Sequence, residues 1–221
     1  MDSFEITLKN QHWLLLPEKA VYWKEQNVLI LTDPHLGKSG HFRKSGIAAP
    51  AQINSSNLAR LESLITKFSP REIIILGDLF HSSVNREWFE FEEWRKRFRN
   101  ISFVLIAGNH DLMDNSFYES AAIEYHDKLV KGPFCLVHDS NDLKEVSGQL
   151  LTVSGHVHPG VKLKGKGRQS LRLPCFYLSD ANIILPAFGA FTGLYTIEPG
   201  ETDRVFTIAD GQVVQILPGG S

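Results

Sequence analysis

Aspartate, histidine and asparagine recur in five short motifs whose side chains could bind metal ions. The motifs are Asp33-Pro34-His35, Gly77-Asp78, Gly108-Asn109-His110-Asp111, Val137-His138 and Gly155-His156-Val157-His158. Mixed imidazole and carboxylate ligands favour Mn²⁺, Fe or Zn²⁺ over Ca²⁺ and Mg²⁺, which prefer oxygen ligands. The motifs contain no cysteine, which argues against a structural zinc site. The predicted metal ligands are Asp33, His35, Asp78, Asn109, His138, His156 and His158.

Spacing within these motifs indicates how the ligands would converge. Asp33 and His35 are two residues apart, so in an extended segment both side chains project to the same side. His156 and His158 repeat this spacing, and the preceding Gly155 would let the backbone approach closely. We therefore expect the two side chains of each pair to point toward the same site.

The remaining ligands favour a centre with two metal ions. Asp78 could bridge two cations through its two carboxylate oxygens, Asn109 would add a neutral amide oxygen, and His138 a further imidazole. Two cations about 3.5–4 Å apart lower the pKa of a bridging water and hold the phosphoryl oxygens during in-line displacement. We predict two divalent ions, Mn²⁺ in the first place with Fe or Zn²⁺ as alternatives.

His110 and Asp111 would give such a centre its catalytic groups. A metal site with a purely structural role has no need for His110, which directly follows the ligand Asn109. A protonated imidazole beside the phosphate would stabilise developing charge or protonate the leaving oxygen. Asp111 could orient the His110 ring or favour its charged form.

Each motif follows a short apolar run that reads as a β-strand. These runs are Val28–Leu31, Ile73–Leu76, Ser102–Ile106, Phe134–Val137 and Leu151–Val153. The carboxyl ends of strands in an α/β sheet converge on a common crevice. Six of the nine histidines fall in the five loops, so we expect one assembled site.

Further elements would frame these strands. Trp13–Leu16 and Ala20–Trp23 read as an opening hairpin, and Ile53–Phe68 has helical spacing of apolar residues. Arg86–Arg99 reads as an amphipathic helix with Trp88, Phe91, Trp94 and Phe98 inward and its charges outward. The segment Leu185–Tyr195 could belong to a core or to an interface.

Composition is that of an ordinary globular protein. With 221 residues, 43% hydrophobic and 22% charged, we expect a single domain over residues 1–221. The net charge of −2 excludes a uniformly basic nucleic-acid-binding protein. We expect buried free thiols at Cys135 and Cys175, no signal peptide, no membrane span and a cytoplasmic location.

The five motifs together resemble the calcineurin-like metallophosphoesterase superfamily. The resemblance implies a mixed α/β fold, a four-layer αββα sandwich with a dinuclear site at the top of two sheets. It also implies that Asp33, His35 and His158 bind one metal and that Asn109, His138 and His156 bind the other. Asp78 would bridge the two metals, and His110 would be the catalytic histidine.

Three longer stretches resemble the bacterial ligase-associated DNA damage response endonuclease family, PdeM. They are Leu31–Lys38, Gly77–Ser82 and Leu185–Gly193, and the similarity runs from the Trp13 hairpin to about Tyr195. Pro34 stands where that family more often has Leu. The resemblance implies a DNA endonuclease in DNA repair that hydrolyses phosphodiester bonds with a metal-activated water, associated with an ATP-dependent DNA ligase and a helicase.

Two features favour a nucleic-acid diester as substrate. The loop after Asp78 lacks the Arg with which protein phosphatases of this superfamily grip a monoester, and it places Phe80 and His81 near the metals, as in SbcD-type nucleases. A basic hairpin, here called the basic ridge, would hold the phosphate backbone, with Lys38, Arg43 and Lys44 opposite. The ridge consists of Lys162, Lys164, Lys166, Arg168 and Arg172, and the predicted substrate-binding residues are His81, Lys38, Lys162, Lys164, Lys166 and Arg168.

Other interpretations stay open at this point. The charged hairpin could serve solubility alone. The same chemistry could act on a cyclic nucleotide or a nucleotide pyrophosphate. A non-catalytic interaction scaffold, as in the retromer subunit that shares this fold, is disfavoured because His110 and every metal ligand are retained.

Overall fold

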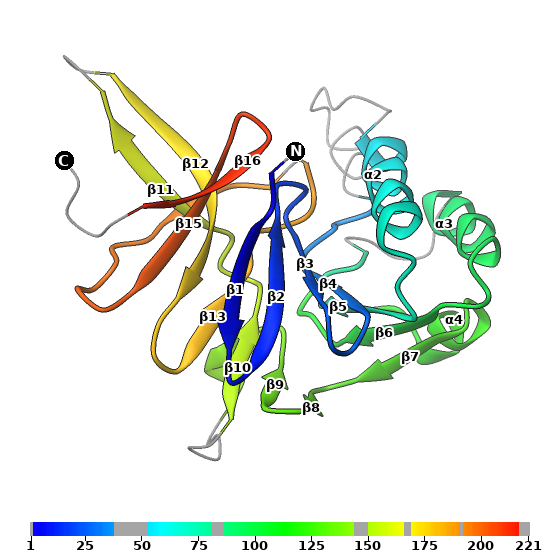
Figure 1. Ribbon diagram of the computed structural model, residues 1–221. Coiled ribbons are helices and arrows are strands. Elements are labelled where there is room, and N and C mark those ends of the chain that lie inside the picture. Colours follow the sequence, from blue (N-terminus) through cyan, green and yellow to red (C-terminus); the bar gives the residue numbers. More distant parts are fainter. Residues whose placement is uncertain are drawn as a thin grey trace.

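Two β-sheets pack face to face in the computed structural model, which describes residues 2–37, 53–80, 86–143, 150–165, 169–190 and 192–216 (Figure 1). The first sheet has seven strands whose order across the sheet follows the chain. Strands β4 to β7 are parallel to one another, whereas β1 to β4 pair antiparallel. These strands are β1 (Phe4–Leu8), β2 (Gln11–Leu16), β3 (Ala20–Trp23), β4 (Val28–Leu31), β5 (Glu72–Leu76), β6 (Ser102–Ile106) and β7 (Ile123–His126).

The second sheet has nine strands, seven of them in the order β14-β11-β12-β13-β10-β9-β8, while β15 pairs with β12 and β16. Its central strands β9, β10 and β13 are parallel. The strands are β8 (Leu129–Lys131), β9 (Phe134–Leu136), β10 (Leu151–Ser154), β11 (Pro159–Lys164), β12 (Ser170–Leu178), β13 (Asn182–Ile184), β14 (Tyr195–Thr196), β15 (Arg204–Ala209) and β16 (Gln212–Ile216).

In the described part of the chain, three α-helices connect the parallel strands of the first sheet. Helix α2 (Ile53–Phe68) links β4 to β5, α3 (Arg86–Lys96) links β5 to β6, and α4 (Asn115–Ser120) links β6 to β7. All three lie on the same side of this sheet, away from the second sheet (Figure 1). A short 3₁₀ helix, η1 (Ser140–Asp142), follows β9.

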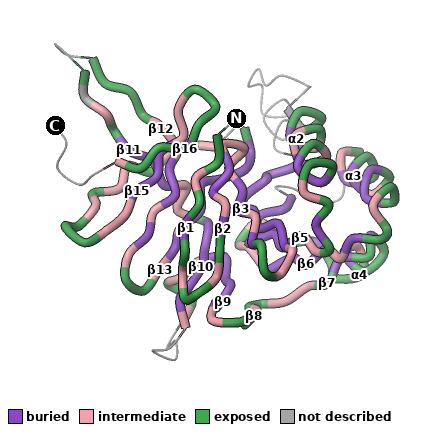
Figure 2. The backbone as a smooth tube through the Cα atoms, in the orientation of Figure 1, coloured by how far each residue is buried: buried purple, intermediate pink, exposed green. Residues whose placement is uncertain are grey.

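Successive side chains of each inner strand point to opposite faces of the sheet and so contribute to two hydrophobic cores. In β4, Val28 and Ile30 belong to the core between the two sheets, whereas Leu29 and Leu31 belong to the core under the helices. All four residues are fully buried, as are most residues of β5 and β6 (Figure 2). A strand buried on both faces is expected to be uniformly apolar, which explains the runs visible in the sequence.

The predicted strands and helices are confirmed, with small differences at their ends. Helix α3 ends at Lys96 rather than at Arg99, and the following turn is held by the buried side chain of Arg95. The Arg95 guanidinium donates to the carbonyls of Phe98, Ile101 and Ala122. The expectation that the charges of this helix all point outward was therefore wrong for Arg95, because these carbonyls satisfy its buried donors.

The mixed α/β architecture with two sheets is confirmed. Within the described part of the chain, the helical layer covers the first sheet only, so a second outer helical layer of the expected αββα sandwich is not seen there. A smaller cluster of Val161, Cys175 and Val205 occupies the outer side of the second sheet instead. The described elements between residues 159 and 216 are the strands β11 to β16, so no described helix covers this face.

Cys135 and Cys175 are free and buried, as expected. Among the described residues, no helix has both the length and the apolar character that crossing a membrane requires.

We predict that Phe134→Ala lowers the free energy of unfolding by about 3–5 kcal/mol, because it removes a ring from the tightest part of the core between the sheets. The Phe134 ring centroid lies 4.6 Å from that of Trp13 and 5.0 Å from that of Trp23. Chemical denaturation measures the change. Val130→Ala on the adjacent strand β8 is the control, because Val130 is 54% exposed and its truncation should cost at most about 0.5 kcal/mol. Equal losses in both variants would contradict this packing role.

Candidate active site

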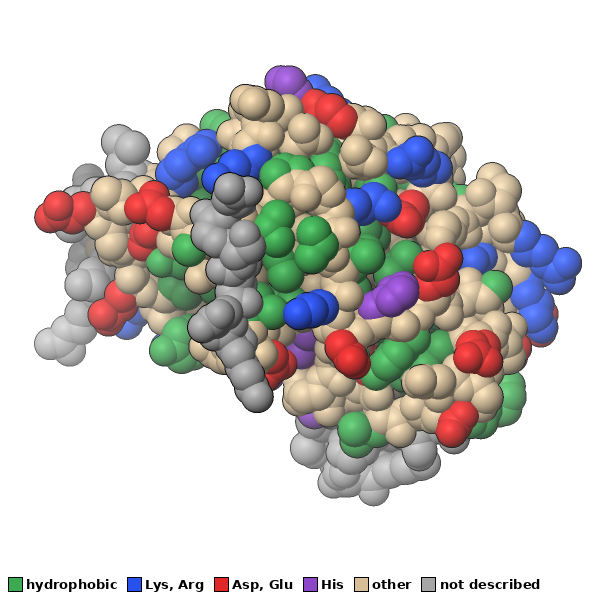
Figure 3. All heavy atoms as spheres, turned by 90° about the horizontal axis from the view of Figure 1, so that it is seen from below, with side chains coloured by type: hydrophobic (Ala, Val, Ile, Leu, Met, Phe, Trp, Pro, Cys, Tyr) green, Lys and Arg blue, Asp and Glu red, His purple; other side chains and the backbone are tan. Residues whose placement is uncertain are grey.

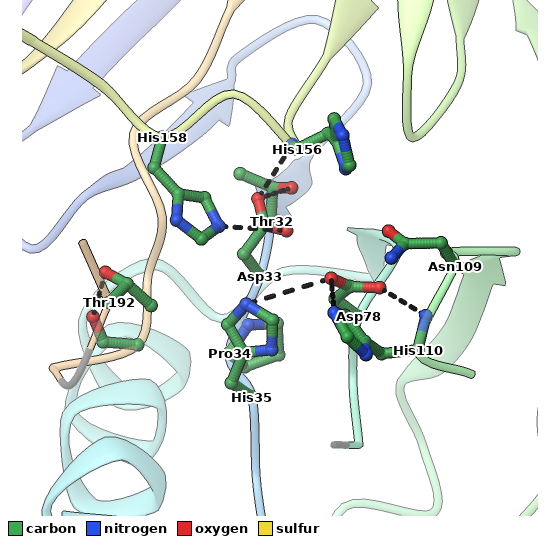
Figure 4. Close-up of polar contacts among 12 residues, drawn as sticks. Thr32, Asp33, Pro34, His35, Asp78, Asn109, His110, His156, His158 and Thr192 are labelled. Atoms are coloured by element: carbon green, nitrogen blue, oxygen red, sulfur yellow. Dashed lines mark hydrogen bonds and ion pairs between the residues drawn. The ribbon is translucent and has the colours of Figure 1, made fainter. Parts of the chain in front are cut away.

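The carboxyl ends of five strands bring the predicted ligands together, as expected (Figure 4). Strands β4, β5 and β6 of the first sheet are adjacent and parallel, and so are β9 and β10 of the second. The first sheet supplies Asp33, His35, Asp78, Asn109 and His110, and the second supplies His138, His156 and His158. The site therefore crosses the boundary between the two sheets.

One group of ligand atoms combines Asp33, His35 and His158, whose candidate atoms lie within 4.8 Å of one another. Nε2 of His158 is 3.4 Å from Oδ1 of Asp33. The His35 and His158 rings meet edge to face with centroids 5.4 Å apart. This group has the composition that the family resemblance implied for the first metal.

A second group combines Asp33, Asp78 and His138, again within 4.8 Å. Nε2 of His138 lies 3.0 Å from Oδ1 of Asn109 and 3.1 Å from Nδ1 of His156. Asn109 and His156 thus surround the imidazole with which they were expected to share a metal.

Asp78 belongs to the second group and also faces His35 of the first. Its Oδ2 is 3.7 Å from Nε2 of His35, and its Oδ1 is 3.6 Å from Nε2 of His138. Each oxygen thus faces a different group, which is the arrangement that a bridging carboxylate needs. Asp33 also belongs to both groups, so two buried carboxylates are shared across the site.

The protein atoms around this site fit divalent cations. Oδ1 of Asp33 is fully buried and has no hydrogen-bond partner among the described residues. A buried, unsatisfied carboxylate oxygen is costly unless a cation or a donor compensates it. Nδ1 of His138 lies 2.9 Å from the Leu76 carbonyl, which holds that imidazole with Nε2 facing the site.

Electrostatics within the site favours ionised Asp33. Burial by itself raises its pKa, but the neighbouring imidazole of His158, together with His138 and the Thr32 hydroxyl, brings the pKa below its ordinary value. Thr32 is itself fully buried, with Oγ1 2.7 Å from Oδ2 of Asp33. The backbone amide of His156 also donates to Oδ2 at 3.0 Å.

Five of the ligands have left-handed backbone conformations. The φ angles are 51° at Asp33, 46° at His35, 52° at Asp78, 63° at His156 and 52° at His158. Non-glycine residues in this region cost about 1–3 kcal/mol each, so the surrounding contacts must hold them there. The expectation that the two pairs lie in extended segments was wrong: the chain turns at each ligand, and these turns bring the side chains together.

Two glycines allow the loops to come this close. A Cβ atom on Gly155 would lie 1.7 Å from Oγ1 of Thr32, so the expected close approach before His156 is confirmed. Gly77 has a φ of +80°, and a Cβ there would lie 2.2 Å from Nδ1 of His138.

His110 lies at the open side of the centre. Its side chain is 40% exposed, and its Nε2 lies 4.0 Å from Oδ2 of Asp78. Its backbone amide donates to Oδ1 of Asp78 at 2.9 Å, and its ring meets that of His35 edge to face at 5.7 Å. The ring is therefore next to the ligands and accessible to a substrate.

Asp111 acts on the backbone of the site. Its buried carboxylate accepts hydrogen bonds from the amides of Asp78 at 2.7 Å, Gly108 at 3.0 Å and Phe80 at 3.2 Å. Burial raises the pKa of Asp111 to about 7, although the amide of Phe80 opposes the shift. These contacts join the loop after β5 to the loop after β6, which gives Asp111 a positioning role in the site.

A segment after β13 supports two of the ligand loops, the one with Asp33 and the one with His156 and His158. Backbone amides of residues 185, 188, 189 and 195 donate to the carbonyls of Ser154, Thr32, Asp33 and His158, at 2.8 to 3.0 Å. Leu185, Ala187 and Phe188 are buried, so this part of Leu185–Tyr195 belongs to the core.

Helix α2 clamps this segment to the Asp33 loop. Asn57 is 2% exposed and donates to the Pro34 carbonyl at 3.3 Å. Arg60 donates to the Phe188 carbonyl and to Oδ1 of Asn57, and its guanidinium lies 4.1 Å from the centre of the Phe188 ring. Asn57 and Arg60 thus join three parts of the chain far apart in sequence.

No motif in the sequence assigned a supporting role to Thr32, Asn57, Arg60 or Phe188. A signal for Asn57 was present: it precedes Leu61 and Leu64 by four and seven residues, on the buried stripe of the helix. A polar residue on such a stripe is expected to have a specific hydrogen-bond partner.

The predicted substrate-binding residues are only partly described. Lys38, His81, Lys166 and Arg168, like Arg43 and Lys44, lie outside the described residues, and of Lys164 only the backbone is described. Lys162 is exposed on β11, and its register partner on β12 is the exposed Arg172. Lys162 and Arg172, the ridge residues whose side chains the structure describes, thus share one face of a hairpin.

Phe80 does not line the site as expected. It is fully buried under the helices, with its ring centroid 5.4 Å from that of Trp88 and 6.4 Å from that of Phe91. A large ring gains more from this core than from a polar site, and it anchors the loop after Asp78.

We predict that Arg60→Ala weakens metal binding about tenfold, because it removes a support of the Asp33 loop. The shift of the melting temperature during a Mn²⁺ titration measures the affinity. Arg71→Ala is the control, because Arg71 bonds to Gln26 at 3.0 Å on the exposed surface. Arg60→Lys should recover part of the affinity, since it keeps the charge over Phe188. The same Mn²⁺ response in Arg60→Ala and Arg71→Ala would contradict the positioning role.

Comparisons with known proteins show which family the chain resembles. Residues 26–180 match the family described as calcineurin-like phosphoesterase. The structure is similar to that of the Pseudomonas putida nuclease MPE, with a TM-score of 0.82 and 34% identity over 97% of this chain and 100% of that one. Yfce, a phosphoesterase from E. coli, is more distant, with a TM-score of 0.45 and 12% identity over 87% of this chain and 99% of that one. A search of curated proteins gave no significant match.

The matched region includes every predicted metal ligand, and the similarity to the nuclease extends over almost the whole chain. The chain therefore belongs to the calcineurin-like phosphoesterase family.

Proposed function

We propose that this protein is a dinuclear-metal-dependent phosphodiesterase that cleaves DNA, with Mn²⁺ as its metal. The observation that carries the proposal is the position of Asp78, whose two oxygens face two different groups of ligands, with the accessible His110 beside them. Similarity to a nuclease over nearly the full length of both chains supports this substrate class.

The donor set indicates which residues would hold the metals. Asp33, His35 and His158 would hold one, Asn109, His138 and His156 the other, and Asp78 would lie between them. Metals bound there would supply Lewis-acid activation of the phosphate and of the attacking water.

The chain itself provides positioning and proton transfer. His110 is held beside Asp78 by its own backbone amide, and its ring is accessible from solvent. There it would stabilise negative charge on the phosphate or give a proton to the leaving oxygen. Asp111 would keep the His110 loop and the Asp78 loop in register through the three amides that it binds.

The basic ridge supports an extended anionic substrate. Strand β11 begins at Pro159, directly after the ligand His158, so Lys162 lies about 13 Å along the strand from that ligand. Lys162 and Arg172 lie opposite each other on one face. A polynucleotide bound at the metals could therefore reach these cations, whereas a small diester could not.

We predict that wild-type protein hydrolyses bis-p-nitrophenyl phosphate with Mn²⁺ and that EDTA abolishes the reaction. His110→Ala should lower kcat about 10²- to 10⁴-fold, because general acid catalysis has this magnitude, and Asp78→Ala should leave only background. His12→Ala is the matched control, since His12 lies on β2 in contact with Glu25. Wild-type rates indistinguishable from those of Asp78→Ala would contradict the proposed enzymatic activity. A strong preference for a monoester substrate would contradict the proposed phosphodiesterase activity.

We also predict that charge reversal of Lys162, Lys164 and Lys166 weakens DNA cleavage far more than hydrolysis of the small diester, because only DNA reaches the ridge. The dependence of cleavage on salt concentration should become shallower, by about one unit of slope per lost phosphate contact. Gel assays on end-labelled single- and double-stranded DNA provide the measurement. The control for net charge is charge reversal of Lys24, Lys67 and Lys96. Lys24 lies in the turn between β3 and β4, Lys67 on α2 and Lys96 on α3. Unchanged DNA cleavage in the ridge variant would show that the strand binds elsewhere.

A further inference from the structure

A hollow of about 620 Å³ adjoins the side of the metal centre formed by Asn109, His138 and His156. His138 belongs to both: it lines the hollow, and its Nε2 faces Asp78, Asn109 and His156. The volume of the hollow falls within the range of about 300–1,000 Å³ typical of small-molecule sites. A group bound there would lie next to a phosphate held at the metals.

Two walls of the hollow directly precede ligand loops. Ala107 is followed by Gly108 and Asn109, and Val137 is followed by His138. The amide of Ala107 donates to the His126 carbonyl at 2.7 Å, which continues the pairing of β6 with β7. The hollow is therefore built on the ends of paired strands.

The end of η1 forms a further wall of the hollow, and Asp139 connects this wall to the metal centre. Asp139 caps η1 by accepting from the amide of Asn141 at 2.9 Å, and its Oδ2 lies 3.7 Å from Nε2 of the ligand His156. Asp142 and Leu143 then reach the hollow. One aspartate thus positions both the wall and a ligand.

The lining of the hollow is chemically mixed. Ala107, Val137 and Leu143 offer apolar surface, while polar groups come from His126, Asp127, Lys128 and Asp142. With two carboxylates beside one lysine, the lining does not favour a second phosphate. The end of the molecule that carries β8 and β9 likewise intersperses acidic with basic side chains (Figure 3).

A nucleoside matches this lining better than a phosphate does. Its base is flat and apolar on its faces, and it carries hydrogen-bond donors and acceptors on its edge, to which His126, Asp127 and Lys128 could bond. Such a combination of apolar walls with a few polar groups is typical of sites that bind neutral aromatic ligands.

We infer that this hollow binds the nucleoside on one side of the scissile phosphodiester. The inference rests on the proposed function and assigns substrate-binding roles to Ala107, His126, Asp127 and Lys128. His126, which lies outside the five sequence motifs, thereby becomes part of the substrate site.

The test compares two diesters that differ in the presence of a nucleoside. One is a short single-stranded DNA oligonucleotide, and the other is methyl p-nitrophenyl phosphate, both with Mn²⁺. Ala107→Leu narrows the hollow, and Asp127→Ala with Lys128→Ala removes its polar groups. Ala59→Leu, an exposed alanine on α2, is the matched control, and melting temperatures verify that each variant is folded.

Ala107→Leu should lower the ratio of kcat/KM for the oligonucleotide to kcat/KM for the small diester about tenfold, and the Asp127/Lys128 double variant about threefold, within the range that pocket contacts contribute to discrimination. Ala59→Leu should keep the wild-type ratio. Wild-type ratios in both hollow variants would overturn the nucleoside subsite and leave the proposed function intact. A wild-type protein inactive on both substrates would instead overturn the proposed function, and the subsite with it.

Discussion

Two carboxylates, those of Asp33 and Asp78, are buried where the carboxyl ends of the two sheets meet, and the surrounding structure compensates for their removal from water. Backbone amides provide part of the compensation, from His156 to Asp33 and from His110 to Asp78. Imidazoles of both sheets provide more. The buried Oδ1 of Asp33 has His158 at 3.4 Å but no hydrogen bond among the described residues, and divalent cations would complete the balance.

This constraint explains why the site needs both sheets. The first sheet contributes both shared carboxylates, and the second contributes three imidazoles. Their approach is set by the core between the sheets, where Trp13, Phe134 and Phe176 are fully buried. A close-packed core resists displacement, so the distances between ligands from opposite sheets are held by packing far from the metals.

The left-handed ligands show how local strain is held in place by distant parts of the chain. The Asp33 loop is bonded to the loop after β5, to the segment after β13 and to helix α2. Arg60 and Phe188 have no place among the ligands, yet they hold the loop that carries two of them. The helical side of the molecule therefore supports the site, while His110 and the hollow at His138 leave it open to a substrate.

The sequence by itself determined the parts of this protein that depend on local pattern. Fully apolar runs such as Val28–Leu31 mark strands buried on both faces, and the Asp, His and Asn residues after them mark one site at the strand ends. Only the tertiary structure decided which side chains meet across the chain. In the folded chain, Phe80 lies in the core and the buried Arg95 binds backbone carbonyls. Asp111 accepts hydrogen bonds from two backbone loops, and Asn57 donates to Pro34. The hydrogen bonds behind these outcomes join residues 6 to 33 positions apart, which propensity and periodicity do not encode.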